Sequence, residues 1–210
     1  MATKGRQDIA LLCLAYRESL DIDYEPLISE MSRKCNLVRL PSTGIALRYL
    51  ANHTPKSIVV TDEGISDPAN QGVVKKLKAY IQNGGWVIFA LDFARSTTAD
   101  QFNKLFSQGF GTPWEYGGRS QITCGFNQQC AIPIGRVPVS ASSYNLEAHL
   151  VKNAAPVEQI VVPMESVESC PAVVAGKQLG KGYLIYCGND SVEVDLDMVI
   201  LSVCNWQWLS

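Results

Sequence analysis

Acidic side chains follow several strand-like segments of this sequence. Asp62 and Glu63 come after one apolar run, Asp92 after the next, and Asn189 with Asp190 after the last. Neighbouring carboxyl groups raise one another's pKa, so such a pair can act as general acid and base or hold a hard divalent cation. We therefore predict Glu63, Asp92 and Asp190 as catalytic residues, and Asp62 and Asn189 as ligand-binding residues. Asp and Asn at strand ends also cap turns and helices, and this structural alternative stays open.

Three further residues are candidates for ligand contact. Cys187 ends the last apolar run, at the same predicted edge, although no basic residue near it in the sequence would lower the pKa of its thiol. A packed strand residue is the alternative interpretation of Cys187. Trp114 and Arg119 lie in the glycine- and aromatic-rich segment 109–119, whose composition is typical of a lid or a pocket wall. An ordinary surface loop is the alternative there.

The sequence indicates neither a metal site nor a nucleotide cofactor. Cys124 and Cys130 lack the further Cys or His ligands that a zinc site needs. No glycine-rich phosphate loop and no GxGxxG motif follows a strand-like segment, so we expect neither FMN nor NAD. His53 precedes a strand-like segment and His149 lies in the irregular second half, which gives a histidine-based mechanism little support. We expect no cofactor and no bound metal.

The elements that would position these residues alternate between strand and helix patterns in the first half of the chain. Apolar runs predict buried strands at 9–16, 57–61 and 86–91, and we predict a further strand at 36–40. Amphipathic spacing predicts intervening helices that begin near Pro26, Thr43 and Val73. Strands joined in this way are parallel, which predicts a flavodoxin-like, doubly wound α/β fold with a mostly parallel sheet. Because ligands bind outside the carboxyl ends of such strands, we expect Asp92 to face solvent there.

The second half of the chain has a different character, because prolines separate short apolar segments. We predict short, partly antiparallel strands near 121–126, 159–162 and 172–175, a turn at 180–182 and a final strand at 183–187. Residues 196–208 form a helical segment that is apolar on nearly every side. One packed face cannot cover all of these side chains, so we expect a homodimer through this C-terminal helix; the alternative is that the segment 110–171 folds over it.

Composition bounds the class of protein. The chain has 210 residues, 47% of them hydrophobic and 18% charged, which is enough for a full core and argues against disorder. We expect a single domain over 1–210. The net charge of −2 argues against nucleic acid and anionic membranes as partners, and no apolar run approaches the roughly 18 residues of a membrane span. Seven scattered cysteines without a CxxC pair are typical of reduced thiols, so we expect a cytoplasmic protein.

Three phrases carry a resemblance to a known family: DEGISD at 62–67, LKAYIQNGGWVIFALDF at 77–93 and GKGYLIYCGND at 180–190. They resemble the class I glutamine amidotransferase-like superfamily, and within it the ThuA-like branch and a set of uncharacterised fungal proteins. The resemblance covers most of the first half and the end of the chain. It implies a flavodoxin-like fold, with a cysteine nucleophile at a sharp turn after a strand and a histidine and a glutamate near the last strand.

The catalytic residues of that superfamily are not matched. Asp92 stands where the resemblance places the thiolate, and no histidine lies near 187–190. Glutamine hydrolysis needs a thiolate, a base and oxyanion donors. We therefore predict an amidotransferase-like domain without glutaminase activity that binds a small molecule at the carboxyl edge of the sheet. Two alternatives stay open: a hydrolase or lyase using carboxylate acid–base chemistry at the same edge, and a homo-oligomeric interaction protein.

Overall fold

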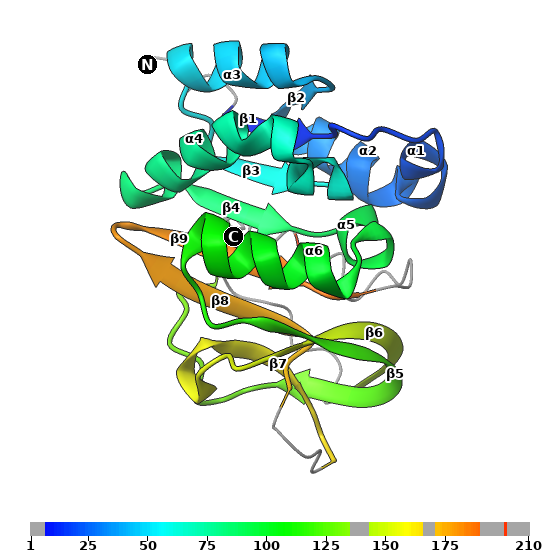
Figure 1. The fold of residues 1–210 in the computed structure, drawn as a ribbon. Helices are drawn as coiled ribbons and strands as arrows, with labels where there is room; N and C mark the ends of the chain where they lie inside the picture. Colours follow the sequence, from blue (N-terminus) through cyan, green and yellow to red (C-terminus); the bar gives the residue numbers. More distant parts are fainter. Residues whose placement is uncertain (1–6, 135–142, 166–170, 190–199, 201–210) are drawn as a thin grey trace, which may run out of the picture.

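Strands and helices alternate through the first half of the chain, and strands predominate in the second (Figure 1). The computed structural model describes residues 7–134, 143–165, 171–189 and 200. The strands are β1 (Asp8–Leu12), β2 (Asn36–Leu40), β3 (Ser57–Val60), β4 (Trp86–Phe89), β5 (Glu115–Phe126), β6 (Tyr144–Lys152), β7 (Gln159–Pro163), β8 (Val174–Leu179) and β9 (Gly182–Cys187). The α-helices are α1 (Ser19–Asp23), α2 (Glu25–Lys34), α3 (Thr43–Asn52), α4 (Gln71–Gln82), α5 (Asp92–Ser96) and α6 (Ala99–Lys104). Short 3-10 helices are η1 (Glu63–Ser66), η2 (Pro68–Asn70) and η4 (Pro156–Glu158), and η3 (Leu105–Phe110) is a π-helix.

The strands of the described residues form one nine-stranded sheet. Its order is β2-β1-β3-β4-β9-β8-β7-β5-β6. The pairs β1/β2, β1/β3, β3/β4 and β4/β9 are parallel, and the remaining neighbours are antiparallel. The parallel part has the flavodoxin-like order, in which the chain reverses direction across the sheet between β1 and β3. The predicted fold class and the parallel arrangement of the first four strands are confirmed.

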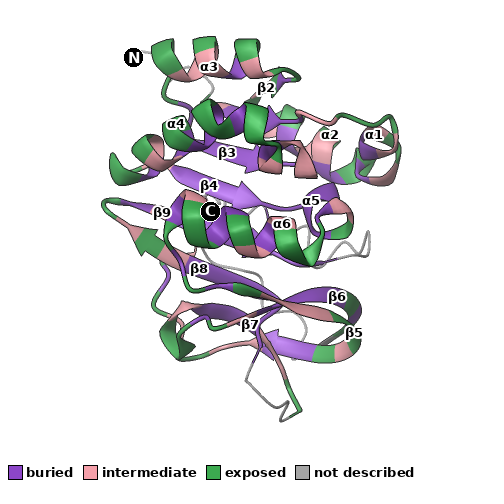
Figure 2. Cartoon of the chain, in the orientation of Figure 1, coloured by how far each residue is buried: buried purple, intermediate pink, exposed green. Residues whose placement is uncertain are grey.

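Side chains alternate along each parallel strand between two apolar layers. Along β1, Ala10 and Leu12 face the layer that holds α3, α4 and α6, whereas Ile9 and Leu11 face the layer that holds α1 and α2. The strands between the helices are accordingly buried on both sides, while the helices expose their outer faces (Figure 2). This two-sided burial explains why the inner parallel strands β1, β3 and β4 have largely apolar sequences.

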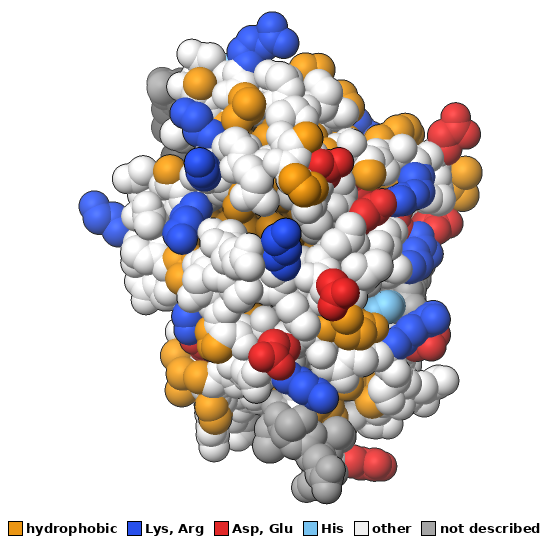
Figure 3. Space-filling view, in the orientation of Figure 1, with side chains coloured by type: hydrophobic (Ala, Val, Ile, Leu, Met, Phe, Trp, Pro, Cys, Tyr) orange, Lys and Arg blue, Asp and Glu red, His pale blue; other side chains and the backbone are white. Residues whose placement is uncertain are grey.

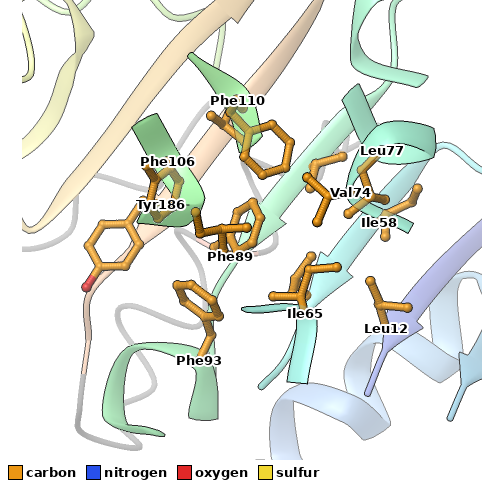
Figure 4. Close-up of a cluster of buried hydrophobic side chains, with 14 of the residues drawn as sticks. Leu12, Ile58, Ile65, Val74, Leu77, Phe89, Phe93, Phe106, Phe110 and Tyr186 are labelled. Atoms are coloured by element: carbon orange, nitrogen blue, oxygen red, sulfur yellow. The ribbon is translucent and has the colours of Figure 1, made fainter. Parts of the chain in front are cut away.

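An aromatic cluster fixes the segment that follows β4. The ring of Phe89 lies 4.8 Å from that of Phe93 and 5.1 Å from that of Phe106, and Phe110 and Tyr186 complete the group (Figure 4). Edge-to-face packing at these distances stabilises α5 and η3 against the sheet. The carboxyl edge of β4 and the wall that η3 forms are therefore rigidly placed.

The second half departs from the prediction of short strands. β5 has 12 residues and pairs with β6 from Glu115↔Lys152 to Cys124↔Tyr144, with a bulge between Tyr116 and Gly118. The segment 109–119 comprises the end of η3, the connection 111–114 that holds Trp114, and the start of β5. The prediction missed β6 and placed β8 two residues early, whereas 159–162 and 183–187 fall within β7 and β9.

The outer strand β6 does not end the sheet with an open edge. Isolated bridges join Ala148 to Asn189 and Val151 to Ala172, and the His149 N–H donates to the Gly188 carbonyl oxygen at 2.7 Å. The antiparallel extension thus folds back onto the chain that flanks β8 and β9.

The predicted helix at 196–208 lies outside the described residues except for Ile200, which is helical and 3% exposed. No helix in the described part of the chain has the length and apolarity of a membrane-spanning segment.

Candidate functional site

The turn after β4 carries an unusual backbone conformation. Leu91 has φ 61° and ψ −130°, a combination that costs a non-glycine residue free energy of about 1–3 kcal/mol. A strained strand-to-helix turn of this kind is the geometry that presents a nucleophile in other α/β enzymes. Here the strained residue is Leu91, one position before the Asp92 that the sequence suggested. Its side chain is 2% exposed and packs in the apolar layer of α1 and α2.

Asp92 is buried rather than solvent-facing. It begins α5, is 3% exposed, and forms an ion pair with Arg95 one helical turn later. Arg95 also contacts Asp23 of α1, with 2.9 Å between Nη2 and Oδ2. The expectation that Asp92 faces solvent is therefore wrong, because the carboxylate is buried and links α5 through an arginine to α1.

Asp62 and Glu63 have different surroundings although they are adjacent. The Asp62 Oδ1 accepts hydrogen bonds from the backbone N–H groups of Ala15 and Gly64, both at 3.0 Å, and its burial raises the pKa of the carboxyl group. Glu63 accepts from the guanidinium of Arg17, which also reaches the Ser96 hydroxyl at 3.4 Å. Burial acts to raise the pKa of Glu63, but hydrogen bonding to Arg17, a backbone hydrogen bond and the charge of Arg17 together outweigh it, and the pKa is lowered.

The described residues at the end of β9 are buried and pack against other parts of the chain. Cys187 is 1% exposed and lies in the same apolar layer as Leu91. Asn189 is 7% exposed, at the bridge to Ala148 of β6. Asp190 lies outside the described residues. The carboxyl edge therefore brings Asp62, Glu63 and Asp92 to neighbouring strand ends, with each carboxylate already engaged by an N–H group or an arginine.

Trp114 and Arg119 lie away from this edge. Trp114 is fully buried, and its indole N–H donates to the Glu158 carboxylate at 3.2 Å. Arg119 is an exposed residue in β5 and pairs with Glu147 across the strand pair at 3.0 Å. Neither side chain lines the groove described below.

Within residues 7–134, 143–165, 171–189 and 200, no three His, Cys, Asp or Glu side chains are grouped to hold a metal ion.

A groove with a volume of about 740 Å³ opens beside the carboxyl ends of β1 and β3. One wall consists of Ala15 and the η1–η2 segment with the start of α4, and the other consists of α6 and η3. The chain reverses direction across the sheet between β1 and β3, which is where open α/β sheets bind ligands. Figure 3 shows the molecular face that carries α4 and α6, with basic and acidic side chains interspersed on it.

Two features of the walls are unusual for a purely structural element. The six residues of η3 form a π-helix, a geometry that is rare and is found mostly at functional positions. In the opposite wall, the Ser66 hydroxyl oxygen is buried and has no hydrogen-bond partner among the described residues. Buried polar groups are nearly always paired, so this oxygen is a position that a water enclosed in the wall would satisfy.

The sequence prediction included Glu63 of this groove and missed most of its lining. The groove exposes the side chains of Gln71 on α4 and of Gln101, Lys104 and Gln108 on the α6–η3 wall. One signal was present: Thr98 and Gln101 form a capping box, and their spacing in the sequence is a helix-start signature. That signature places α6 after β4, but it does not show that α6 packs beside η1.

Comparisons with known proteins identify the class of fold. No family model matches the sequence, and no curated protein is significantly similar to it. Among solved structures, a ThuA-like protein from Bacteroides uniformis superposes with a TM-score of 0.61 at 11% identity, covering 97% of this chain and 91% of that one. A ThuA-like protein from Parabacteroides merdae has a TM-score of 0.59 at 12% identity, covering 97% and 90%. The β-galactosidase of Halorubrum lacusprofundi has a TM-score of 0.58 at 13% identity, and this chain spans 30% of its length.

These similarities establish the fold. The chain has the architecture of ThuA-like proteins, in agreement with the amidotransferase-like fold that the sequence resemblance implies.

Proposed function

We propose that this chain is a small-molecule-binding domain on an amidotransferase-like fold and that it lacks glutaminase activity. The observation that carries the proposal is the turn after β4, where the strained position holds Leu91 with a buried side chain. A leucine has no lone pair with which to attack a carboxamide. The fold similarity to ThuA-like proteins supports the scaffold, and the substitution at the turn supports the loss of nucleophilic chemistry.

The ligand site in this proposal is the groove between η1 and α6. Its volume of about 740 Å³ falls within the range of about 300–1,000 Å³ that is typical of small-molecule sites. Its position outside the carboxyl ends of β1 and β3, at the switch point, supports the same assignment. Glu63 is the residue of the sequence-predicted site that belongs to the groove, while Asp62 and Asp92 act behind it as buried hydrogen-bonding partners.

Acid–base catalysis by the edge carboxylates has less support than binding. A general acid or base works best when its pKa lies near the working pH. The pKa of Glu63 is lowered from the ordinary carboxyl value, and Asp92 is held in an ion pair with Arg95. A homodimer through 196–208 and a cytoplasmic location remain predictions that accompany this proposal.

Ammonia release from glutamine tests the first half of the proposal. We expect a rate equal to that of a protein-free blank, with an active amidotransferase as positive control. Cys187→Ala is the matched variant, because Cys187 is the cysteine at the predicted edge. Measurable ammonia release that disappears in Cys187→Ala would mean that the nucleophile lies on β9 and that the proposal is wrong.

Ligand screening by NMR tests the second half. A mixed library of metabolites is first screened for compounds that shift backbone amide signals of the groove walls. We expect these compounds to lose their effect in Gln108→Trp, because the new indole fills the groove from an exposed position. Lys76→Trp places the same indole on an exposed position of α4 that does not line the groove, and it should preserve the effect. Binders that are unaffected by Gln108→Trp, or a library without binders, would contradict the assignment of the groove.

A further inference from the structure

The charges in the groove are not equally compensated. The lining contains three carboxylates, Glu63, Asp67 and Asp100, and one ammonium group, Lys104. Glu63 is paired with Arg17, whose guanidinium forms hydrogen bonds to both carboxylate oxygens. Once this pair is set aside, two carboxylates and one ammonium group remain.

The two remaining carboxylates stand on opposite walls. Asp67 follows η1, and its Oδ1 accepts a hydrogen bond from the backbone N–H of Ala69 at 2.8 Å, which leaves its other oxygen available. Asp100 lies in the first turn of α6 on the facing wall. Both residues are exposed, and neither forms an ion pair with a described residue. The groove therefore has a negative charge on each wall.

The neutral groups of the lining can hydrogen-bond to a ligand of either sign. Gln71 and Gln108 are exposed amides, and Gln101 keeps its amide N–H₂ free of the capping box. These groups do not select between a cation and an anion. The selection rests on the charged residues, whose sum is negative.

We propose that the groove binds an organic cation bearing a primary ammonium group, held between Asp67 and Asp100 with hydrogen bonds from the neighbouring amides. The inference rests on the proposed function, since it takes the groove as the ligand site, and it adds the chemical class of the ligand. Lys104 opposes the cation and limits its affinity. The sign of the charge is thus set by two carboxylates against one ammonium group, in a groove that has a π-helical wall.

Three four-carbon probes of matched length test this inference: 1,4-diaminobutane, 1,4-butanediol and succinate. We expect the diamine to perturb amide signals of the groove walls saturably, and more weakly as ionic strength rises, because exposed charges are screened by salt. We expect no saturable effect from the diol or from succinate. An equal effect of succinate or the diol would overturn the inference. The absence of a saturable effect of the diamine up to about 10 mM, which corresponds to a binding free energy weaker than about −3 kcal/mol, would overturn it as well.

Charge variants provide a second readout. Asp67→Asn keeps an oxygen for the hydrogen bond from the Ala69 N–H, and Asp100→Asn removes only a charge. Each variant should weaken diamine binding by about two- to fivefold, the range expected for an exposed ion pair. Lys104→Met removes a like charge without removing a cap and should tighten binding by a similar factor. Glu165→Gln removes an exposed carboxylate outside the groove and should have no effect.

Unchanged affinity in both Asn variants, or weaker binding in Lys104→Met, would show that the charge argument is wrong. Failure of this inference can be distinguished from failure of the proposed function. The library screen with Gln108→Trp tests whether the groove binds any ligand, whereas the three probes test the sign of the charge that it prefers.

Discussion

Replacement of Asp62 separates the hydrogen-bonding role of this side chain from its charge. Its Oδ1 accepts from the Ala15 and Gly64 N–H groups at 3.0 Å, and its Oδ2 lies 3.3 Å from the Thr61 hydroxyl. In Asp62→Asn the amide oxygen can keep both backbone hydrogen bonds. The new N–H₂ can then donate to the Thr61 oxygen, because that hydroxyl can place its own hydrogen on the Leu12 carbonyl at 3.1 Å.

Asp62→Ala removes the acceptor altogether. The two backbone N–H groups that link the ends of β1 and β3 then lose their partner in a largely buried position, where Asp62 is 3% exposed. A buried donor without a partner costs about 1–3 kcal/mol, so we expect Asp62→Ala to lower the free energy of unfolding by about 2–4 kcal/mol. Asp62→Asn should remain within about 1 kcal/mol of the wild type.

The charge of Asp62 adds a pH dependence with a definite sign. Burial raises the pKa of Asp62 above its ordinary value of 3.8, so the folded protein binds this proton more tightly than the unfolded chain does. The contribution of Asp62 to stability is therefore largest below pH 3.8 and is lost as the pH rises through its folded pKa. Relative to the wild type, Asp62→Asn should gain stability over this interval.

Urea unfolding followed by tryptophan fluorescence measures these differences, with equal m-values as the condition for comparing the variants. Measurements on both variants at pH 7, and on the wild type and Asp62→Asn from pH 3 to pH 7, cover the two arguments. A loss in Asp62→Asn as large as that in Asp62→Ala would refute the reasoning, because it would show that the negative charge itself stabilises the fold. A constant difference across the pH range would refute the assigned direction of the pKa shift.

Three further substitutions test the local geometry. Leu91→Gly should be more stable than Leu91→Ala by about 1 kcal/mol, because both remove the same packing and glycine adopts positive φ without cost; equal stabilities in denaturation would mean that the turn is unstrained. Asp92→Asn should lower the free energy of unfolding by about 1–3 kcal/mol, since the buried carboxylate holds an arginine, and an unchanged melting temperature would contradict this role. Gly188→Ala should yield little folded protein by near-UV circular dichroism, because its Cβ would lie 1.8 Å from the His149 carbonyl oxygen, whereas Gly44→Ala, with no atom within 4 Å of the added Cβ, should fold normally.

The parallel half of the fold was predictable because its determinants are local. The strands β1, β3 and β4 are buried on both faces and are therefore largely apolar, and the helices between the strands have their own amphipathic patterns. The pairing of β5 with β6 has no comparable local signal. The sequence predicts a strand only for the second half of β5, because the exposed and half-buried residues of its first half are typical of a loop or a pocket wall. The glycines of that first half lie at a bulge.

From the sequence, the candidate site could be predicted only as far as which strand ends carry carboxylates. Carboxylates at the ends of β3 and β4 could be placed at one edge, but their partners, Arg17 for Glu63 and Arg95 for Asp92, follow from the arrangement of α1, α5 and η1 in space. The backbone conformation of Leu91 leaves no trace in residue type, since a leucine is disfavoured at positive φ. The groove depends on the packing of α6 beside η1, which no single segment specifies.

The position of β9 between β4 and β8 has a consequence for synthesis of the chain. During synthesis, β1 to β4 emerge from the ribosome long before Gly182–Cys187 does. Every residue of β4 nevertheless pairs with β9 in the folded chain. Until then the apolar strand Trp86–Phe89 has one unpaired edge, a template for contact with other nascent chains. Translation arrest or a premature stop codon before residue 182 should therefore produce an aggregating fragment and not a smaller folded protein, and chaperone demand should be greatest during this interval.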